Sequence, residues 1–203
     1  ESSKRAFYAD FGIHYEFNTT GNQKWAAGLV FAPSLQVNHE NNLTYSNSST
    51  SEGVDKSYHS RTQYLPMHIG TGISMTTERW VVTTDYNYLD WSRNTSSYTS
   101  MKYENQHKLN IGGAYITNPR LPRSTELMGG IGLSNSYINL RGGKMKYLEV
   151  SAGASFPIRY SYLSLGATWR KQINSRSSLM QESRFSMNLN ITFGERISRS
   201  KLR

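Results

Sequence analysis

The side chains that could carry out covalent chemistry in this sequence are few and scattered. His59 and Ser60 are adjacent, and His14 lies on the same face of a predicted strand as Asp10 and Glu16. A catalytic nucleophile needs a base within hydrogen-bond reach and a third group that orients this base. No spacing in the sequence supplies that arrangement, so we interpret His14 as a polar residue that faces the lumen of a barrel and predict that the protein is not an enzyme.

The histidines also form no metal-binding motif. His39, His59 and His68 match no compact ligand spacing, and the sequence contains no Cys. The lack of Cys further excludes a disulfide scaffold. We therefore expect neither a metal ion nor another cofactor.

Other polar residues could bind a ligand without transforming it. The cations His68, Arg170 and Arg184 fall on one predicted strand face, and an Arg can bind a carboxylate through two parallel hydrogen bonds. The same cations could instead pair with acidic residues of that face, which are Asp10, Glu16, Asp85 and Glu149. The predicted ligand-binding residues are His68, Arg170, Arg184, Asp85 and His14.

Small residues crowd this same face. Its glycines are Gly12, Gly28, Gly70, Gly72, Gly112, Gly130, Gly132, Gly153 and Gly166. They either relieve crowding in a tightly curved sheet or leave room for a plug or an elongated ligand, and both interpretations can hold together.

Segments of alternating apolar and polar residues must position these side chains. The clearest segment is 184–193, in which every second residue is apolar. Successive side chains of a strand point to opposite faces, so this strand has one apolar and one polar face. Similar segments are 7–17, 24–38 (with a distortion expected at Pro33), 65–75, 80–89, 107–117, 126–134, 148–156 and 163–170.

The connections between these segments favour a membrane barrel over a soluble sandwich. Short turns alternate with long polar loops, which include 39–63, 92–105 and 172–183, and aromatic residues collect near the strand ends. Outer-membrane barrels have short periplasmic turns, long external loops and aromatic girdles. We predict an all-β, antiparallel, up-and-down transmembrane barrel in the bacterial outer membrane, in contact with lipid or detergent.

Charge and strand count refine this prediction. The net charge is +9, but Lys and Arg are dispersed and no recognition motif accompanies them, so we expect no nucleic-acid partner. We predict that residues 1–193 form the barrel portion and that 194–203 form a basic periplasmic tail. Single-chain bacterial barrels usually have an even number of strands, so about nine strands suggest the C-terminal part of a larger barrel.

One hairpin resembles a known family. The residues LPMHIGTG (65–72), TERW (77–80) and DYNYLDWS (85–92) resemble the C-terminal half of FadL-type outer-membrane transporters of hydrophobic compounds. The ending ITFGER (191–196) is similar to that of the Bacteroidetes versions. The hairpin is the strongest part of a resemblance that spans about residues 6–196.

The resemblance implies a porin-like barrel of about fourteen strands, an even number as in other single-chain barrels. It also implies an N-terminal hatch and passive uptake of hydrophobic molecules such as long-chain fatty acids. The sequence shows neither a hatch nor the early strands, so no ligand-contacting residue is carried over. Two alternatives stay open: a FadL-type barrel that serves as a structural or cargo-handling subunit of an outer-membrane secretion complex, together with other outer-membrane proteins, and an outer-membrane enzyme.

Overall fold

The fold is built entirely from β-strands in the part of the chain that can be described. The computed structural model describes residues 2–19, 23–46, 53–59, 63–96, 98, 100–121, 123–140, 143–158, 161–174 and 181–193. No helix in these ranges is long and apolar enough to cross a membrane.

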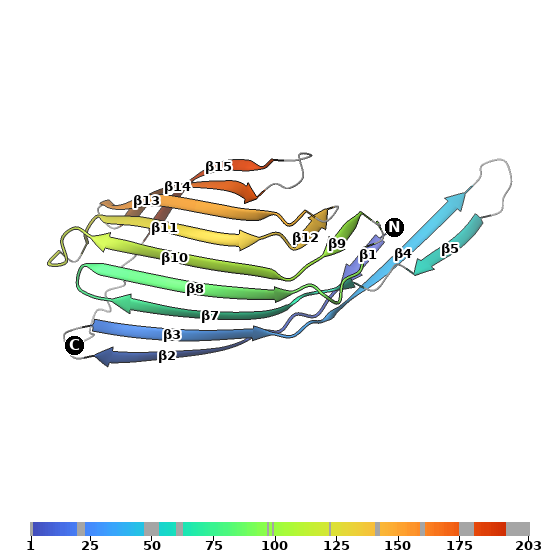
Figure 1. The fold of residues 1–203 in the computed structure, drawn as a ribbon, viewed down its shortest axis with the longest axis horizontal. Helices are drawn as coiled ribbons and strands as arrows, with labels where there is room; N and C mark the ends of the chain where they lie inside the picture. The colour runs from blue at the N-terminus through green and yellow to red at the C-terminus, as the bar shows by residue number, and fades with distance from the viewer. Residues whose placement is uncertain are drawn as a thin grey trace, which may run out of the picture.

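Nine antiparallel strands form one continuous sheet (Figure 1). Each of these strands pairs with the one that follows it in the sheet and along the chain, so the sheet is an up-and-down meander. In order, the strands are β2 (Phe11–Thr19), β3 (Gln23–Ala32), β7 (Met67–Thr76), β8 (Trp80–Asp90), β10 (Gln106–Ile116), β11 (Glu126–Asn135), β13 (Lys146–Ile158), β14 (Ser161–Asn174) and β15 (Ser183–Phe193). Strands are present at all nine predicted positions, including the glycine-rich β11, but the strand predicted at 24–38 ends at Ala32.

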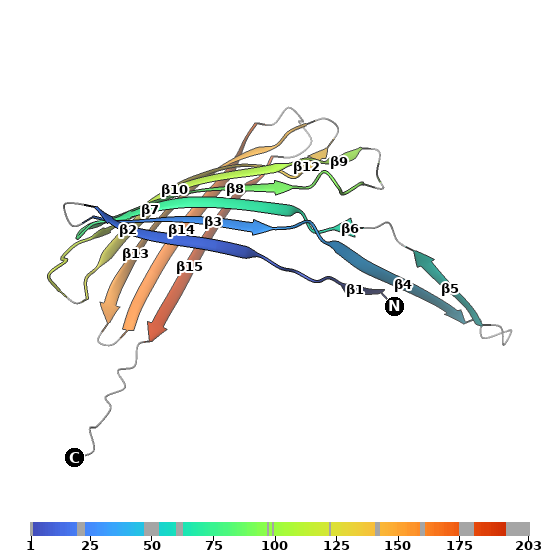
Figure 2. The ribbon, with the colours of Figure 1, turned by 90° about the horizontal axis from the view of Figure 1, so that it is seen from below.

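The sheet is curved and twisted, and among the described residues it is not closed. Its edges are β2 and β15, which each pair with one neighbour only. Figure 2 shows that the strands near the β15 edge run at a steep angle to those near the β2 edge. This is the accumulated twist expected of a many-stranded antiparallel sheet. The predicted all-β antiparallel class is therefore confirmed.

The connections divide the sheet into two ends. One end, which we call the turn end, has the connections 20–22, 77–79, 117–125 and 159–160. The other end, which we call the loop end, has the connections 33–66, 91–105, 136–145 and 175–182. The predicted alternation of short and long connections is less regular than expected. The turn-end connection 117–125 is longer than 175–182 at the loop end, and Thr117 and Ser124 bond across its base, with an Oγ1–Oγ distance of 3.1 Å.

The loop end carries six further strands. These are β1 (Ser2–Arg5), β4 (Gln36–Ser46), β5 (Gly53–His59), β6 (Gln63–Tyr64), β9 (Met101–Tyr103) and β12 (Ile138–Leu140). The long polar loops predicted at 39–63 and 92–105 therefore contain strands, which the sequence did not predict. A hairpin in water satisfies its backbone hydrogen bonds without an apolar face, so the hydrophobic pattern gave no sign of it. At Pro33 the chain leaves the sheet, because Pro has no N–H to donate to a ladder.

The sheet has an apolar face that no described residue covers. Apolar side chains of neighbouring strands lie opposite one another on this face, as Tyr15 does to Ala27 and Val150 to Ile131. Ile131, on the inner strand β11, is 57% exposed, and Met187 on the edge strand β15 is 77% exposed. The buried hydrophobic residues among those described are only Ala32 and Tyr147, so the sheet has no core of the soluble kind.

Aromatic residues border the apolar face at both ends. At the turn end, Phe17 stacks on Trp25 and Trp80 contacts Tyr115, with ring centroids 6.4 Å and 4.7 Å apart. At the loop end, the rings of Tyr88 and His107 lie 5.2 Å apart. The predicted enrichment of aromatic residues at strand ends is thus present, and these residues lie on the apolar face, at its two ends.

Candidate functional site

The opposite face of the sheet is polar, and one row across it holds most of the predicted ligand-binding residues. His14 on β2, Asp85 on β8, Arg170 on β14 and Arg184 on β15 belong to a single register row. The complete row is His14, Gly28, Gly72, Asp85, Asn110, Gly132, Glu149, Arg170 and Arg184. His68 lies on the same face but four residues back along β7. The prediction that these residues share a face is confirmed.

Asp85 is held by amide groups and not by one of the predicted cations. Its Oδ2 accepts hydrogen bonds from Asn87 Nδ2 at 3.0 Å and from Asn110 Nδ2 at 2.9 Å. Asn87 Oδ1 lies 2.8 Å from His68 Nε2. Because an amide oxygen can only accept, His68 Nε2 must carry the proton in this contact. The four side chains form one continuous hydrogen-bonded chain along the polar face.

The cations each have a local partner. The Arg170 guanidinium lies 4.1 Å from the centroid of the Tyr147 ring, a cation–π arrangement. Arg184 Nη2 lies 3.8 Å from a carboxylate oxygen of Glu182 on the same strand edge. His14 Nδ1 similarly lies 3.9 Å from Glu16. The structure does not bring the cations together around one anion site, and their ligand-binding roles stay predictions.

Three glycines on this face make room for asparagine side chains of the neighbouring strand. Gly70 lies opposite Asn87, Gly132 opposite Asn110 and Gly166 opposite Asn188. A Cβ atom at Gly132 would lie 2.7 Å from Asn110 Oδ1, and one at Gly70 would lie 2.9 Å from Asn87 Oδ1. Any larger residue would therefore push the amide off the sheet. The sequence analysis found these glycines but not their asparagine partners, because pairing requires the strand register.

The polar face is also hollowed. A depression of about 440 Å³ extends from β8 to β15, and its lining includes Asp85, Asn110, Glu149, Thr168 and Asn188. Asn110 Nδ2 donates a hydrogen bond to Asp85 Oδ2 within it. These two lining residues are therefore already bonded to each other within the protein.

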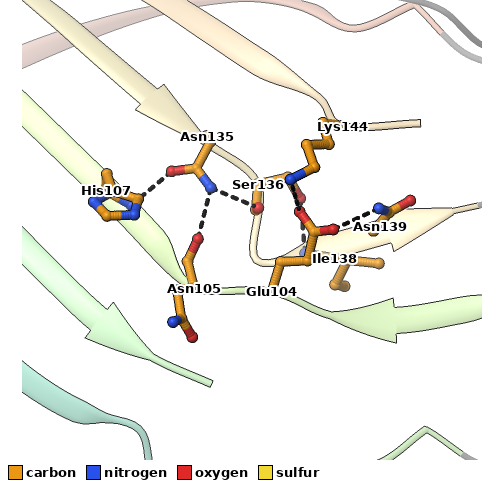
Figure 3. Close-up of polar contacts among 8 residues, drawn as sticks. All are labelled: Glu104, Asn105, His107, Asn135, Ser136, Ile138, Asn139 and Lys144. Carbon is orange, nitrogen blue, oxygen red and sulfur yellow. Dashed lines mark hydrogen bonds and ion pairs between the residues drawn. The ribbon is translucent and has the colours of Figure 1, made fainter. Parts of the chain in front are cut away.

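A second polar cluster lies at the loop end, where β9 pairs with β12 (Figure 3). Asn135 Oδ1 accepts a hydrogen bond from the His107 backbone N–H at 2.6 Å, and Asn135 Nδ2 donates to the Asn105 carbonyl at 2.7 Å. Glu104 accepts a hydrogen bond from Asn139 Nδ2 at 2.7 Å and lies 3.5 Å from Lys144 Nζ. We call these six residues, with Lys102 and Lys146 beside them, the rim cluster.

Aromatic stacking stiffens the segment that carries the rim cluster. The Trp91 ring stacks on Tyr137 at 4.6 Å and on Tyr103 at 6.2 Å. The Glu104 backbone N–H donates to the Tyr137 carbonyl at 2.9 Å. The rim cluster could not be predicted from the sequence, because the two segments that carry it lack strand periodicity. The only local signal was the presence of large aromatic residues in polar loops.

Catalytic and metal sites receive no support from this geometry. Within the described ranges, no three His, Cys, Asp or Glu residues are grouped so that they could hold a metal ion. The prediction that the protein is not an enzyme stays a prediction.

Comparison with known proteins gives one match. A family model described as BamG matches residues 1–200. No curated protein and no solved structure matches the chain. The predicted FadL-type resemblance is therefore wrong. The hairpin at 65–92 suggested it, but alternating apolar and small polar residues with terminal aromatic residues suit any strand pair with one apolar and one polar face.

Proposed function

The chain belongs to the BamG family, whose name ties it to the BAM complex of the outer membrane, and on this premise we propose that it is a membrane-spanning subunit of a BAM-like complex. In this role it associates with other outer-membrane proteins. The polypeptide contributes a wall of amphipathic strands, and the loop end faces the cell exterior.

The observation that carries this proposal is the uncovered apolar face. Soluble monomers rarely expose contiguous apolar patches larger than about a few hundred Å². Here such a surface extends over all nine strands, from Ile13 on β2 to Leu189 on β15. Lipid at the membrane core, with aromatic residues at both borders, accounts for it, and we propose that the sheet is part of a transmembrane β-barrel.

The polar face supports a structural role over the uptake of a ligand. Asp85 is satisfied by Asn87 and Asn110, and Arg170 is stacked on Tyr147. A binding site for an anionic head group would leave cations convergent and free, whereas these polar groups brace neighbouring strands. The family match likewise gives no support to fatty-acid uptake.

Affinity purification of the full-length protein from solubilised outer membranes tests the assignment to a complex. We expect other outer-membrane proteins, including BAM components, to co-purify at constant ratio through a second, size-based step. An unrelated tagged outer-membrane barrel expressed at the same level is the control. Recovery of the protein alone, under conditions in which a known outer-membrane complex stays intact, would contradict the proposal.

The orientation of the sheet can be tested by single cysteines, since the sequence has none of its own. Arg93 at the loop end and Leu121 at the turn end are both exposed. We expect Arg93→Cys to react with a membrane-impermeant thiol reagent on intact cells. Leu121→Cys should react only after the outer membrane has been opened. The reverse pattern would show that the sheet is inverted, and equal labelling of both on intact cells would argue against a spanning sheet.

A further inference from the structure

We propose that the rim cluster holds an anionic, phosphate-bearing lipid, with Lys102 and Lys146 at the phosphate and the adjoining apolar face against the acyl chains. This inference rests on the proposed function, because it requires the apolar face to lie in the membrane. It goes further in assigning a specific ligand class to one place on that face.

The site is a hollow of about 950 Å³ at the loop end. Its lower wall is formed by apolar side chains of successive strands, among them Tyr86, Leu109 and Leu133. These three residues belong to one register row of the apolar face. Leu109 is 41% exposed and Leu133 is 46% exposed, so the wall is open to an apolar ligand.

The polarity of the hollow changes along the strand direction. One row nearer the loop end, the wall is formed by His107 and Asn135, and Lys146 lies opposite Asn135. Above this row, β9 contributes Lys102. The lining of the hollow is therefore first apolar, then aromatic and amide-bearing, and finally positively charged at the lysines. The acyl, ester and phosphate regions of a lipid follow one another in the same order. Lys side chains at a membrane border extend in this way toward charged head groups.

The charge balance of the hollow favours an anion. The lysine and carboxylate side chains that line it are three lysines and one glutamate, Glu104. Glu104 is already engaged by Asn139 and by Lys144. Neither Lys102 nor Lys146 has an acidic partner within ion-pair distance among the described residues. Two ammonium groups beside an apolar wall are therefore left for a phosphate, which Lys binds as a point charge.

The hollow is held open by the hydrogen bonds and ring stacking described above. Asn135 fixes the His107 backbone, and the rings of Trp91, Tyr103 and Tyr137 contact one another. A site that is formed before binding loses little conformational entropy when the ligand enters. A soluble phosphate would contact the lysines only, whereas a lipid also covers Leu109 and Leu133. The geometry therefore points to the lipid.

The experiment measures lipid retention by the purified full-length protein in nanodiscs. Phosphatidylglycerol is titrated into a phosphatidylcholine background, and bound lipid is counted by native mass spectrometry. We expect Lys102→Gln/Lys146→Gln to retain phosphatidylglycerol about tenfold less well, since each lysine near a membrane surface contributes to anion attraction. Lys24→Gln/Lys108→Gln removes the same charge from the polar face and is the matched control. The β-sheet circular dichroism spectrum of each variant reports its folding.

Three outcomes decide the inference. A selective loss in the rim variant, with inorganic phosphate unable to displace the lipid, supports it. Equal loss in both double variants would mean that only net charge matters, and displacement by inorganic phosphate alone would mean an anion site without a lipid; either result overturns the inference. Should the rim variant fail to fold, Leu133→Ser replaces it, and unchanged lipid retention in that variant overturns the inference. Absence of co-purifying proteins alongside selective lipid retention would contradict only the proposed complex.

Discussion

Replacing Leu165 with Arg is expected to lower the free energy of unfolding in a lipid bilayer by about 2–4 kcal/mol, the cost of a cation on the lipid face near the middle of a membrane strand. Leu165 lies within β14, points to the apolar face and is 47% exposed. In lipid, the guanidinium would lose water without gaining a partner. Reversible urea unfolding from vesicles, followed by tryptophan fluorescence, measures the change.

Thr168→Arg is the matched control for this experiment. Thr168 is on the same strand but on the polar face, where it lines the depression between Ser151 and Ser186. We expect its replacement to cost less than about 1 kcal/mol, as for a surface substitution away from special features. If both variants were destabilised equally, the assignment of the two faces would be wrong. If neither were destabilised, the apolar face would not lie in lipid.

The second large effect is expected at Gly153. A Cβ atom there would lie 2.9 Å from the backbone oxygen of Leu165 on the neighbouring strand. A backbone atom within a hydrogen-bonded ladder cannot move aside as a side chain can. Gly153→Ala is therefore expected to lower the free energy of unfolding by about 1–3 kcal/mol, the usual cost of overpacking. The same unfolding assay measures it.

Gly28 provides the comparison for Gly153. It is also a strand glycine of the polar face, but the nearest atom to its added Cβ is the Ile13 backbone oxygen at 3.9 Å, an ordinary contact. Gly28→Ala should change the unfolding free energy by no more than about 0.5 kcal/mol. An equal cost at both positions would show that the loss arises from something other than steric contact at Gly153.

The long strands could be predicted from the sequence because a period of two is a local property. In β15, Phe185 to Ile191 alternate with polar residues, and this pattern needs no knowledge of neighbouring strands. β9 and β12 could not be predicted in this way. Each has three residues, and they pair across a large separation in sequence, with Ile138 opposite Tyr103.

The candidate site was predictable only as a set of residues on one face. Asp85 and Arg170 were assigned correctly to the polar face by their position in alternating segments. Their contacts depend on the register between strands, which the connections determine. For this reason the pairing of Asn110 with Gly132, and of Arg170 with Tyr147, became visible only in three dimensions.

The direction of the two sheet edges restricts what can lie beside them. β2 and β15 both run toward the turn end. In a sheet of nine strands that alternate in direction, the first and the last strand have the same direction. Direct pairing of β2 with β15 would be parallel, unlike every other pair in the sheet. In a second copy of the sheet with the same orientation, both edge strands would also run toward the turn end. They would therefore pair with β2 and β15 in parallel. Antiparallel neighbours for both edges must therefore run toward the loop end and come from outside these nine strands. A sheet extended by such strands is not built from symmetric copies of this one.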